Sequence, residues 1–195
     1  MVRAFDPLID FAGIWNYKLA DRYLPLPELP KARYECVAGR VIVTSTEGFT
    51  NSYGEVELAH ILRSAARNAG MRVTGRINLL FEPNNWLEPH LAVLRERPDP
   101  EEDTWVPVNL CEMAVEFVSP SNRKSDLIDK PLVYARFGVP YLMRVELVGR
   151  LGHAHVELFK LEGKAYSPVQ AAIAGQRFVA QEPFDMDFDP RDLLG

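Results

Sequence analysis

The chain has 195 residues, of which 47% are hydrophobic and 25% are charged, and this balance predicts one folded domain spanning residues 1–195 with a substantial core. The 27 acidic residues outnumber the 22 basic ones, so the formal net charge is −5 and the summed field does not attract a polyanion. Any nucleic-acid binding must therefore rest on a local basic patch.

The two cysteines, Cys36 and Cys111, both lie within apolar runs, which is typical of reduced, buried thiols rather than of a disulfide framework. The N-terminus has no basic start followed by an apolar segment, and no stretch reaches the roughly 18 apolar residues that a membrane span requires. We therefore expect a cytoplasmic protein with no membrane partner.

The first 45 residues predict a lead-in and a hairpin. Residues 1–32 combine aromatic side chains with closely spaced prolines, which predicts a short helix and an extended stretch packed on the domain. Residues 34–38 and 41–45 are strand-like and are separated by Gly39 and Arg40, so they predict a β-hairpin with a short turn.

A long helix is predicted next. Ser52 and Glu55 have the spacing of a capping box, and apolar residues recur at helical spacing from Val56 to Ala69. Gly70 then supplies a natural end to the helix.

The second half of the chain is richer in strands. A helical stretch follows Ser121 and runs to Phe137, but it contains Pro131; either the helix kinks there or, as we favour, it breaks and Asp129 caps the second piece. Strands are predicted at residues 73–81, 87–94, 110–118, 141–148, 155–161 and 164–166, with at most two short strands within 178–188. Strands thus outnumber two principal helices, so the predicted fold class is α/β (α+β), a mixed central β-sheet flanked by helices.

Alternation along residues 110–118 decides which acidic side chains can cooperate. The odd-numbered residues form an apolar face, so Glu112 and Glu116 share the other face. They are four residues apart, about 13 Å at ~3.3 Å per residue, which is too far to hold one ion. Glu116 is the better candidate because it lies near the strand end, where loops open a cleft. His90, in the preceding strand-like run, would lie beside Glu116 if the two strands pair.

Several short motifs occur together in the chain. They are Arg33-Tyr34-Glu35 before a Gly-containing turn, Pro89-x-Leu91, Val115-Glu116-x-Val118-Ser119-Pro120-Ser121, and Asp126 with Lys130-Pro131-x-x-Tyr134-Ala135-x-x-Gly138-Val139. As a set they resemble the Uma-two family of restriction-endonuclease-like proteins, in the PD-(D/E)XK nuclease superfamily, and most closely its actinobacterial members. The similarity runs from about residue 24 to the C-terminus. It implies a restriction-endonuclease-like fold and a metal-dependent endonuclease whose partner is DNA.

The resemblance implies roles for four residues, namely Glu35, His90, Glu116 and Lys130. Glu116 matches the metal-binding glutamate, and His90 stands where the family has an aspartate, so these two would hold the divalent ion. Glu35 matches the glutamate of the first strand and would assist the metal or a water molecule. Lys130 matches a lysine displaced from the strand to the helix, where it would orient the attacking water or stabilise the phosphoryl charge.

Three positions depart from the usual pattern. Val118 occupies the strand position that holds the lysine in the wider superfamily, Met143 replaces a tryptophan, and His90 replaces the aspartate.

In such an enzyme the divalent ion neutralises phosphoryl oxygens and lowers the pKa of a bound water. Magnesium prefers oxygen ligands, whereas imidazole suits transition metals and removes one negative charge. We therefore expect weak Mg²⁺ binding, with Mn²⁺ or a transition metal as the alternative cofactor.

Three hypotheses follow. The first is a metal-dependent endonuclease that hydrolyses DNA phosphodiester bonds and is impaired by His90. The second is a catalytically inactive nuclease-fold protein that acts in nucleic-acid binding or regulation. The third is an oligomerisation role, in which exposed strand edges pair to form a homodimer. Each of the four candidate residues alone has an ordinary structural explanation, and only their joint pattern points to chemistry.

Other polar clusters favour structural explanations. The outermost of the possible ligands within residues 153–157 are ~13 Å apart on a strand, which fits an exposed hairpin better than a metal site. Aspartates alternate with apolar residues in residues 185–189, which indicates an edge strand rather than a calcium loop. A basic patch near the cleft could be formed by Arg63, Arg67, Arg72, Arg76, Arg123 and Lys124, although isolated arginines on a helix are usually only solvated.

Overall fold

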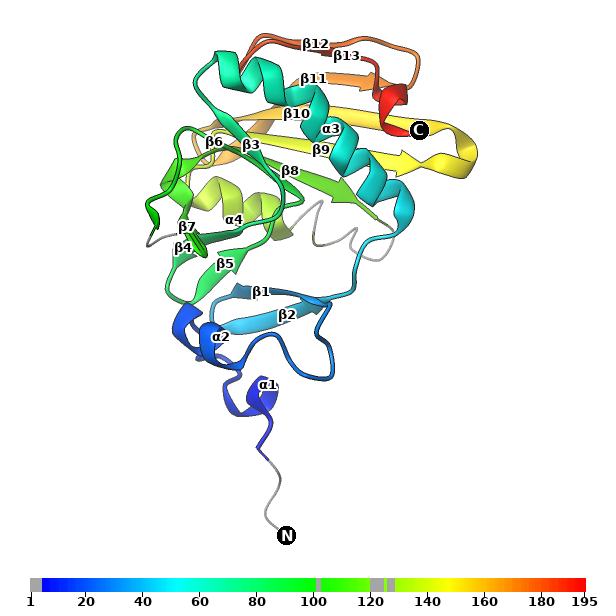
Figure 1. Ribbon diagram of the computed structural model, residues 1–195. Helices are drawn as coiled ribbons and strands as arrows, with labels where there is room; N and C mark the ends of the chain where they lie inside the picture. The colour runs from blue at the N-terminus through cyan, green and yellow to red at the C-terminus, as the bar shows by residue number, and fades with distance from the viewer. Residues whose placement is uncertain (1–4, 101–102, 120–124, 126–128) are drawn as a thin grey trace.

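The structure, a computed structural model, describes residues 5–100, 103–119, 125 and 129–195 (Figure 1). Its α-helices are α1 (Pro7–Asp10), α2 (Tyr17–Tyr23), α3 (Phe49–Asn68) and α4 (Lys130–Arg136). Its strands are β1 (Arg33–Val37), β2 (Arg40–Thr44), β3 (Arg72–Thr74), β4 (Asn78–Glu82), β5 (Asn85–Leu87), β6 (Leu91–Leu94), β7 (Trp105–Pro107), β8 (Cys111–Val118), β9 (Tyr141–Val148), β10 (His153–Glu162), β11 (Ala165–Ile173), β12 (Phe178–Ala180) and β13 (Met186–Phe188).

The strands form two principal mixed sheets and a small hairpin sheet. Sheet A has the order β2-β1-β5-β4-β7, sheet B has the order β11-β10-β9-β8-β6-β3, and β12 pairs with β13. One pair in each principal sheet is parallel, β4 with β7 and β8 with β9, and the remaining pairs are antiparallel. The predicted class, mixed sheets flanked by helices, is confirmed, with the strands divided between two sheets rather than gathered in one.

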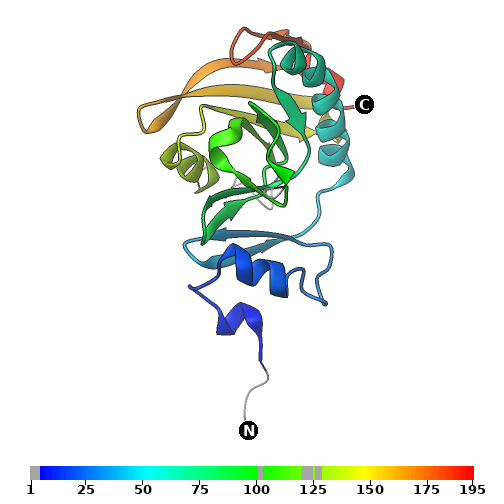
Figure 2. The ribbon, with the colours of Figure 1, turned by 60° about the vertical axis from the view of Figure 1, so that its left-hand side comes forward.

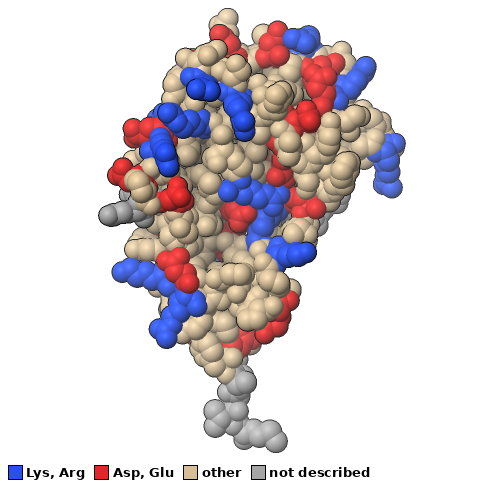
Figure 3. Space-filling view, in the orientation of Figure 1, with Lys and Arg blue, Asp and Glu red and all other residues tan. Residues whose placement is uncertain are grey.

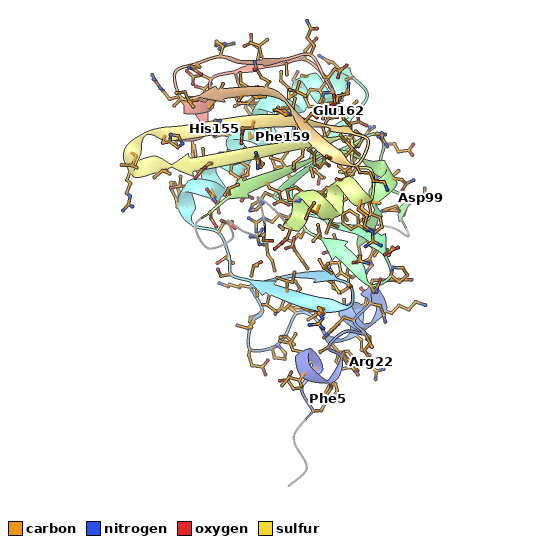
Figure 4. All side chains as sticks on the ribbon, turned by 180° about the vertical axis from the view of Figure 1, so that it is seen from behind. Phe5, Arg22, Asp99, His155, Phe159 and Glu162 are labelled. Atoms are coloured by element: carbon orange, nitrogen blue, oxygen red, sulfur yellow. The ribbon has the colours of Figure 1, made fainter. Side chains whose placement is uncertain are left out.

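Helices α3 and α4 lie on opposite faces of sheet B (Figures 1 and 4). From α3, the buried residues Leu58, Leu62 and Ala66 pack on the apolar side chains of β8 and β9. Gly54 permits the closest approach, because a Cβ there would collide with the side chain of Leu147. Helix α4 packs on the other face, where its buried Tyr134 joins the core that sheet B shares with sheet A.

That second core positions the candidate site. It combines residues of β4, β5 and β7 from sheet A with residues of β6, β8 and β9 from sheet B. The N-terminal lead-in covers the far side of sheet A, where Trp15 packs against Cys36 and Trp86 (Figure 2). Any side chain that points from β1 or β8 into the space between the sheets is therefore removed from bulk water.

Two predicted strands were wrong in extent, because each is divided between the two sheets. Residues 73–81 break at Gly75 into β3 of sheet B and β4 of sheet A. Residues 87–94 break at 88–90 into β5 of sheet A and β6 of sheet B. Both halves of each run are apolar, so hydrophobicity alone does not reveal where the chain leaves one sheet for the other.

The helix ends also differ from the predictions. Helix α3 begins at Phe49 after Gly48, so Ser52 lies inside the helix and the predicted capping box does not form. Its C-terminus is followed by Gly70 in the left-handed region at φ +79°, as predicted. Helix α4 begins at Lys130, directly after Asp129 as favoured, although the Asp129 side chain makes no capping hydrogen bond. The preceding part of that predicted helix lies mostly outside the described residues.

Both cysteines are buried free thiols, and burial raises the pKa of each to about 12. Among the described residues, no helix has the length and apolar character needed to cross a membrane.

Candidate functional site

The candidate site lies between sheets A and B, and four elements contribute to it. Glu35 is at the centre of β1, Glu116 is near the end of β8, His90 directly precedes β6, and Lys130 is the first residue of α4. Pleating explains why Arg33 joins them, since Arg33 and Glu35 share one face of β1. The structure brings all four sequence-predicted residues into one cluster, and all are buried.

His90 is the centre of this cluster. Its backbone N–H donates to the carbonyl of Val115 at 3.1 Å, which continues the pairing of β6 with β8 beyond the end of β6. Its ring Nδ1 lies 2.6 Å from Oε2 of Glu116, and its Nε2 lies 3.3 Å from Oε1 of Glu47. The ring is 0% exposed, so both contacts are shielded from water.

The protonation of His90 follows from what surrounds the ring. Carboxylates flank both nitrogens, and the 2.6 Å contact to Glu116 fits a charge-assisted N–H···O bond. Two other donors also face the ring, the N–H of Phe117 at 3.2 Å from Nδ1 and the guanidinium of Arg33 at 3.3 Å from Nε2. These longer contacts would suit a neutral acceptor nitrogen. The short contact to Glu116 places a proton on Nδ1, and we assign a second proton to Nε2, hence an imidazolium, because a carboxylate oxygen of Glu47 also faces that nitrogen.

The pKa of His90 agrees with this assignment. Burial disfavours the charged ring, but hydrogen bonds to Glu116 and Glu47 outweigh burial and raise the pKa of His90 to about 9. Burial also opposes ionisation of Glu116, yet the charge of Lys130 and the bond from His90 lower the pKa of Glu116 to about 2. Similarly, the pKa of Glu47 falls to about 2 despite burial, mainly through His90 and Asn51.

Lys130 connects the two sheets. Its Nζ lies 2.9 Å from Oε1 of Glu35 in sheet A and 3.3 Å from Oε2 of Glu116 in sheet B. Glu35 also accepts the backbone N–H of Glu88 at 2.9 Å. The other oxygen of Glu116 accepts the hydroxyl of Tyr134 at 2.6 Å, and the burial of that hydroxyl beside a carboxylate raises the pKa of Tyr134 well above its usual value.

Opposite charges are paired within the described part of the cluster. The carboxylates of Glu35, Glu47 and Glu116 face three cations, Lys130, the imidazolium of His90, and an arginine whose Nη2 lies 2.6 Å from Glu47. Burial raises the pKa of a further nearby carboxyl, that of Glu88. Among the residues that the structure describes, no three His, Cys, Asp or Glu side chains are grouped so that they could hold a metal ion. The described side chains therefore form a network of buried ion pairs.

Sequence reasoning missed three contributors to this network. Glu47 was not considered, because it lies in the link between β2 and α3, where no periodic pattern assigns a direction to its side chain. Arg33 and Tyr134 belong to the motifs that carry the family resemblance, but they had no predicted role. The hydroxyl of Tyr134, one helical turn after Lys130, was the available signal, since a buried hydroxyl requires a partner.

The remaining polar clusters lie apart from this site. Glu112 pairs with Arg95 at the other end of β8, as expected if only one of the two strand glutamates reaches the site. Figure 4 shows His155 and Phe159 on β10, on the same strand as Glu157, which pairs with Arg144 at 3.0 Å. The Phe184, Met186 and Phe188 side chains are buried while the alternating aspartates are exposed, which confirms an edge strand. Arg123, Lys124 and Asp126 lie outside the described residues.

Comparison with known proteins gives a family and a fold. A model of the Uma2 family, described as "Putative restriction endonuclease", matches residues 20–190. The chain belongs to the Uma2 family. The solved structure of a putative nuclease belonging to DUF820, from Anabaena variabilis, is similar with a TM-score of 0.63. That likeness covers 89% of this chain and 96% of the other at 14% identity, so it supports the fold alone. No curated protein sequence matches the chain significantly.

Proposed function

We propose that this Uma2-family chain is a nucleic-acid-binding protein on a nuclease scaffold, and that its native site does not support Mg²⁺-dependent DNA cleavage. The observation that carries the argument against cleavage is the 2.6 Å contact between His90 and Glu116 inside a buried network of ion pairs, and the family membership supports nucleic acid as the ligand. The imidazolium of His90 is hydrogen-bonded to the carboxylate of Glu116 that a divalent ion would need as a ligand.

The donor set explains why Mg²⁺ fits poorly. Magnesium requires oxygen ligands in near-octahedral geometry, and the position of the usual aspartate offers a ring nitrogen instead. For Glu116 to bind an ion on the side that faces His90, the ring would have to lose its proton and release Oε2. Removing partners from buried ion pairs costs about 3–5 kcal/mol.

A second candidate function, metal-dependent endonuclease, is favoured by a different observation. The ammonium of Lys130 contacts both carboxylates, at 2.9 Å from Glu35 and 3.3 Å from Glu116. With His90 deprotonated, a nitrogen ligand beside Glu116 suits Mn²⁺ or another transition metal better than Mg²⁺. In that candidate the ion would supply a nucleophilic water and neutralise phosphoryl oxygens, and Lys130 would contribute a fixed positive charge.

Plasmid cleavage separates the two candidates. Supercoiled DNA is incubated with Mg²⁺ or Mn²⁺ and with wild type, His90→Asp, Lys130→Ala or the His90→Asp/Lys130→Ala double variant. We expect no cleavage by wild type with either metal, cleavage by His90→Asp with Mg²⁺, and its loss in the double variant. Wild-type cleavage that Lys130→Ala abolishes would establish the endonuclease instead.

Binding is measured on the same preparations. Wild type should increase the fluorescence anisotropy of a labelled 20-base-pair duplex at low salt without shortening it. Because the chain carries a net charge of −5, an unspecific attraction is not expected, and binding must depend on local basic side chains. Wild type that neither cuts nor binds nucleic acid would refute the proposed function.

A further inference from the structure

We propose that a groove formed by α3 and β3, lined by Arg63, Arg67 and Arg72, holds the phosphodiester backbone of duplex DNA. This inference rests on the proposed nucleic-acid binding and assigns the surface that performs it.

Local structure places the three arginines together. Arg63 and Arg67 are four residues apart in α3, so they lie on one face of the helix, about 6 Å apart along its axis. Gly70, at φ +79°, ends the helix, and Arg72 starts β3 immediately afterwards. A hollow of about 430 Å³ lies between these elements, lined by Arg63, Arg67, Gly70, Met71, Arg72 and Val73. No acidic side chain of the described residues lines it.

These arginines differ from many others in the chain because they lack acidic partners. Six arginines form ion pairs with carboxylates: Arg33, Arg76, Arg95, Arg136, Arg144 and Arg177. None of Arg63, Arg67 and Arg72 forms an ion pair with any residue that the structure describes, and all three are exposed. Like charges at the i, i+4 spacing of Arg63 and Arg67 also repel each other. The groove is thus a concentrated positive surface on an otherwise acidic chain.

The groove continues toward the candidate site. Arg63 also lines a second hollow, of about 410 Å³, whose lining includes His90 and Glu55, and Glu55 pairs with Arg76. Ala59 and His60 of α3 line the same hollow one turn earlier, opposite Gly75. Figure 3 shows basic side chains gathered over the C-terminal end of α3 and β3, with a further mixed basic and acidic group nearer the centre of the same face.

The spacing of these arginines favours a polymer over a single anion. Arg63 and Arg67 are about 6 Å apart along the helix axis, and Arg72 adds a third cation at the start of β3. A free phosphate would engage only part of this groove. Three separate cations, open to solvent in a groove that no acidic side chain of the described residues lines, are complementary to a charged backbone.

The test compares salt dependence. Binding of a 20-base-pair duplex is followed by anisotropy from 50 mM to 300 mM NaCl for wild type, Arg63→Gln/Arg67→Gln, and a control pair, Arg40→Gln/Arg150→Gln. The control removes the same charge from exposed arginines that line neither hollow. Removing two phosphate contacts should lower the slope of log K against log salt by about 1.8. If the affinities of wild type and variant converge near about 1 M salt, the variant should bind about 200-fold more weakly at 50 mM, with wild-type behaviour in the control.

Three results would overturn the inference. If the groove variant keeps the wild-type affinity and slope, the groove is not the binding surface, although the proposed function stands. If the control pair loses as much affinity, the effect is one of total charge. If wild type does not bind duplex DNA, the groove assignment and the proposed function both fail. The same titration with a single-stranded 20-mer tests whether the groove holds single strands instead of a duplex. For single strands, the loss of two phosphate contacts should change the slope of log K against log salt by about 1.4. Unchanged circular dichroism and melting verify that the groove variant is folded.

Discussion

Replacing His90 with aspartate gives a stability test that does not depend on activity. The substitution removes the cation that serves both Glu116 and Glu47 and adds a third negative group beside them. Removing one partner of a buried ion pair costs about 3–5 kcal/mol. In a chain of 195 residues each kcal/mol shifts the melting temperature by roughly 2–4 °C. Without divalent ions, His90→Asp should therefore melt about 6–20 °C below wild type.

Magnesium should restore much of that loss in the variant only. The added carboxylate and Glu116 provide oxygen ligands, and for a Kd of about 0.1 mM, 10 mM Mg²⁺ stabilises the folded state by about 2.7 kcal/mol, or roughly 5–11 °C. Differential scanning calorimetry with EDTA and with Mg²⁺ measures both effects, with His153→Asp as the exposed control. A wild-type melting temperature that rises with Mg²⁺ as much as that of His90→Asp would refute the argument that His90 blocks the ion.

Three further predictions concern the same packing. His90 has a pKa of about 9 in the folded protein against 6.5 in the unfolded chain, so its protonation stabilises the fold fully below pH 6.5. This contribution, up to about 3 kcal/mol at 1.36 kcal/mol per pH unit, should be lost as the pH rises through 9. Equal free energies of unfolding in wild type at pH 6 and pH 9.5, measured by chemical denaturation, would disprove it. Tyr134→Phe leaves a buried oxygen of Glu116 without its donor and should cost about 1–3 kcal/mol in urea unfolding, whereas no change would mean that water replaces the hydroxyl. Gly54→Ala should lower the free energy of unfolding by about 1–3 kcal/mol, because the added methyl group overpacks the contact between α3 and sheet B. Gly75→Ala, where the methyl group meets open space, should not lower it. Equal urea midpoints for the two variants would contradict this packing.

The parts of the site that could be predicted are those set by local periodicity. Alternation along β8 assigned Glu116 to the face opposite the α3 core and separated it from Glu112, and both assignments match the contacts observed. The Gly70 end of α3 follows from the backbone freedom of glycine. Lys130 follows from helical spacing together with the family resemblance, because periodicity alone does not orient the first residue of a helix.

The parts that were missed depend on contacts between distant segments. His90 was expected on a strand face, yet it lies in the link between β5 and β6, and it reaches Glu116 because the chain crosses there from sheet A to sheet B. Glu47 comes from another link, after β2, and meets His90 across 43 residues of sequence. No pattern of period 2 or 3.6 reports the direction of a side chain in such links. The contact of His90 with Glu116 was therefore predicted only on the condition that their strands pair, and Glu47 was missed.

The ionic cluster also has a mechanical consequence that is independent of catalysis. Lys130 holds Glu35 of sheet A and Glu116 of sheet B, while His90 holds Glu116 and Glu47, so three segments distant in sequence are joined through buried charges. Any single neutral replacement leaves an unpaired charge in a dry environment, which destabilises the fold more than a neutral core contact of the same size would. Glu35, Glu116 and Lys130 therefore contribute to the stability of the fold whether or not a phosphodiester is cut. It follows that the presence of these residues does not by itself indicate an active enzyme, and that an activity loss in Lys130→Ala has catalytic meaning only when the variant is shown to be folded.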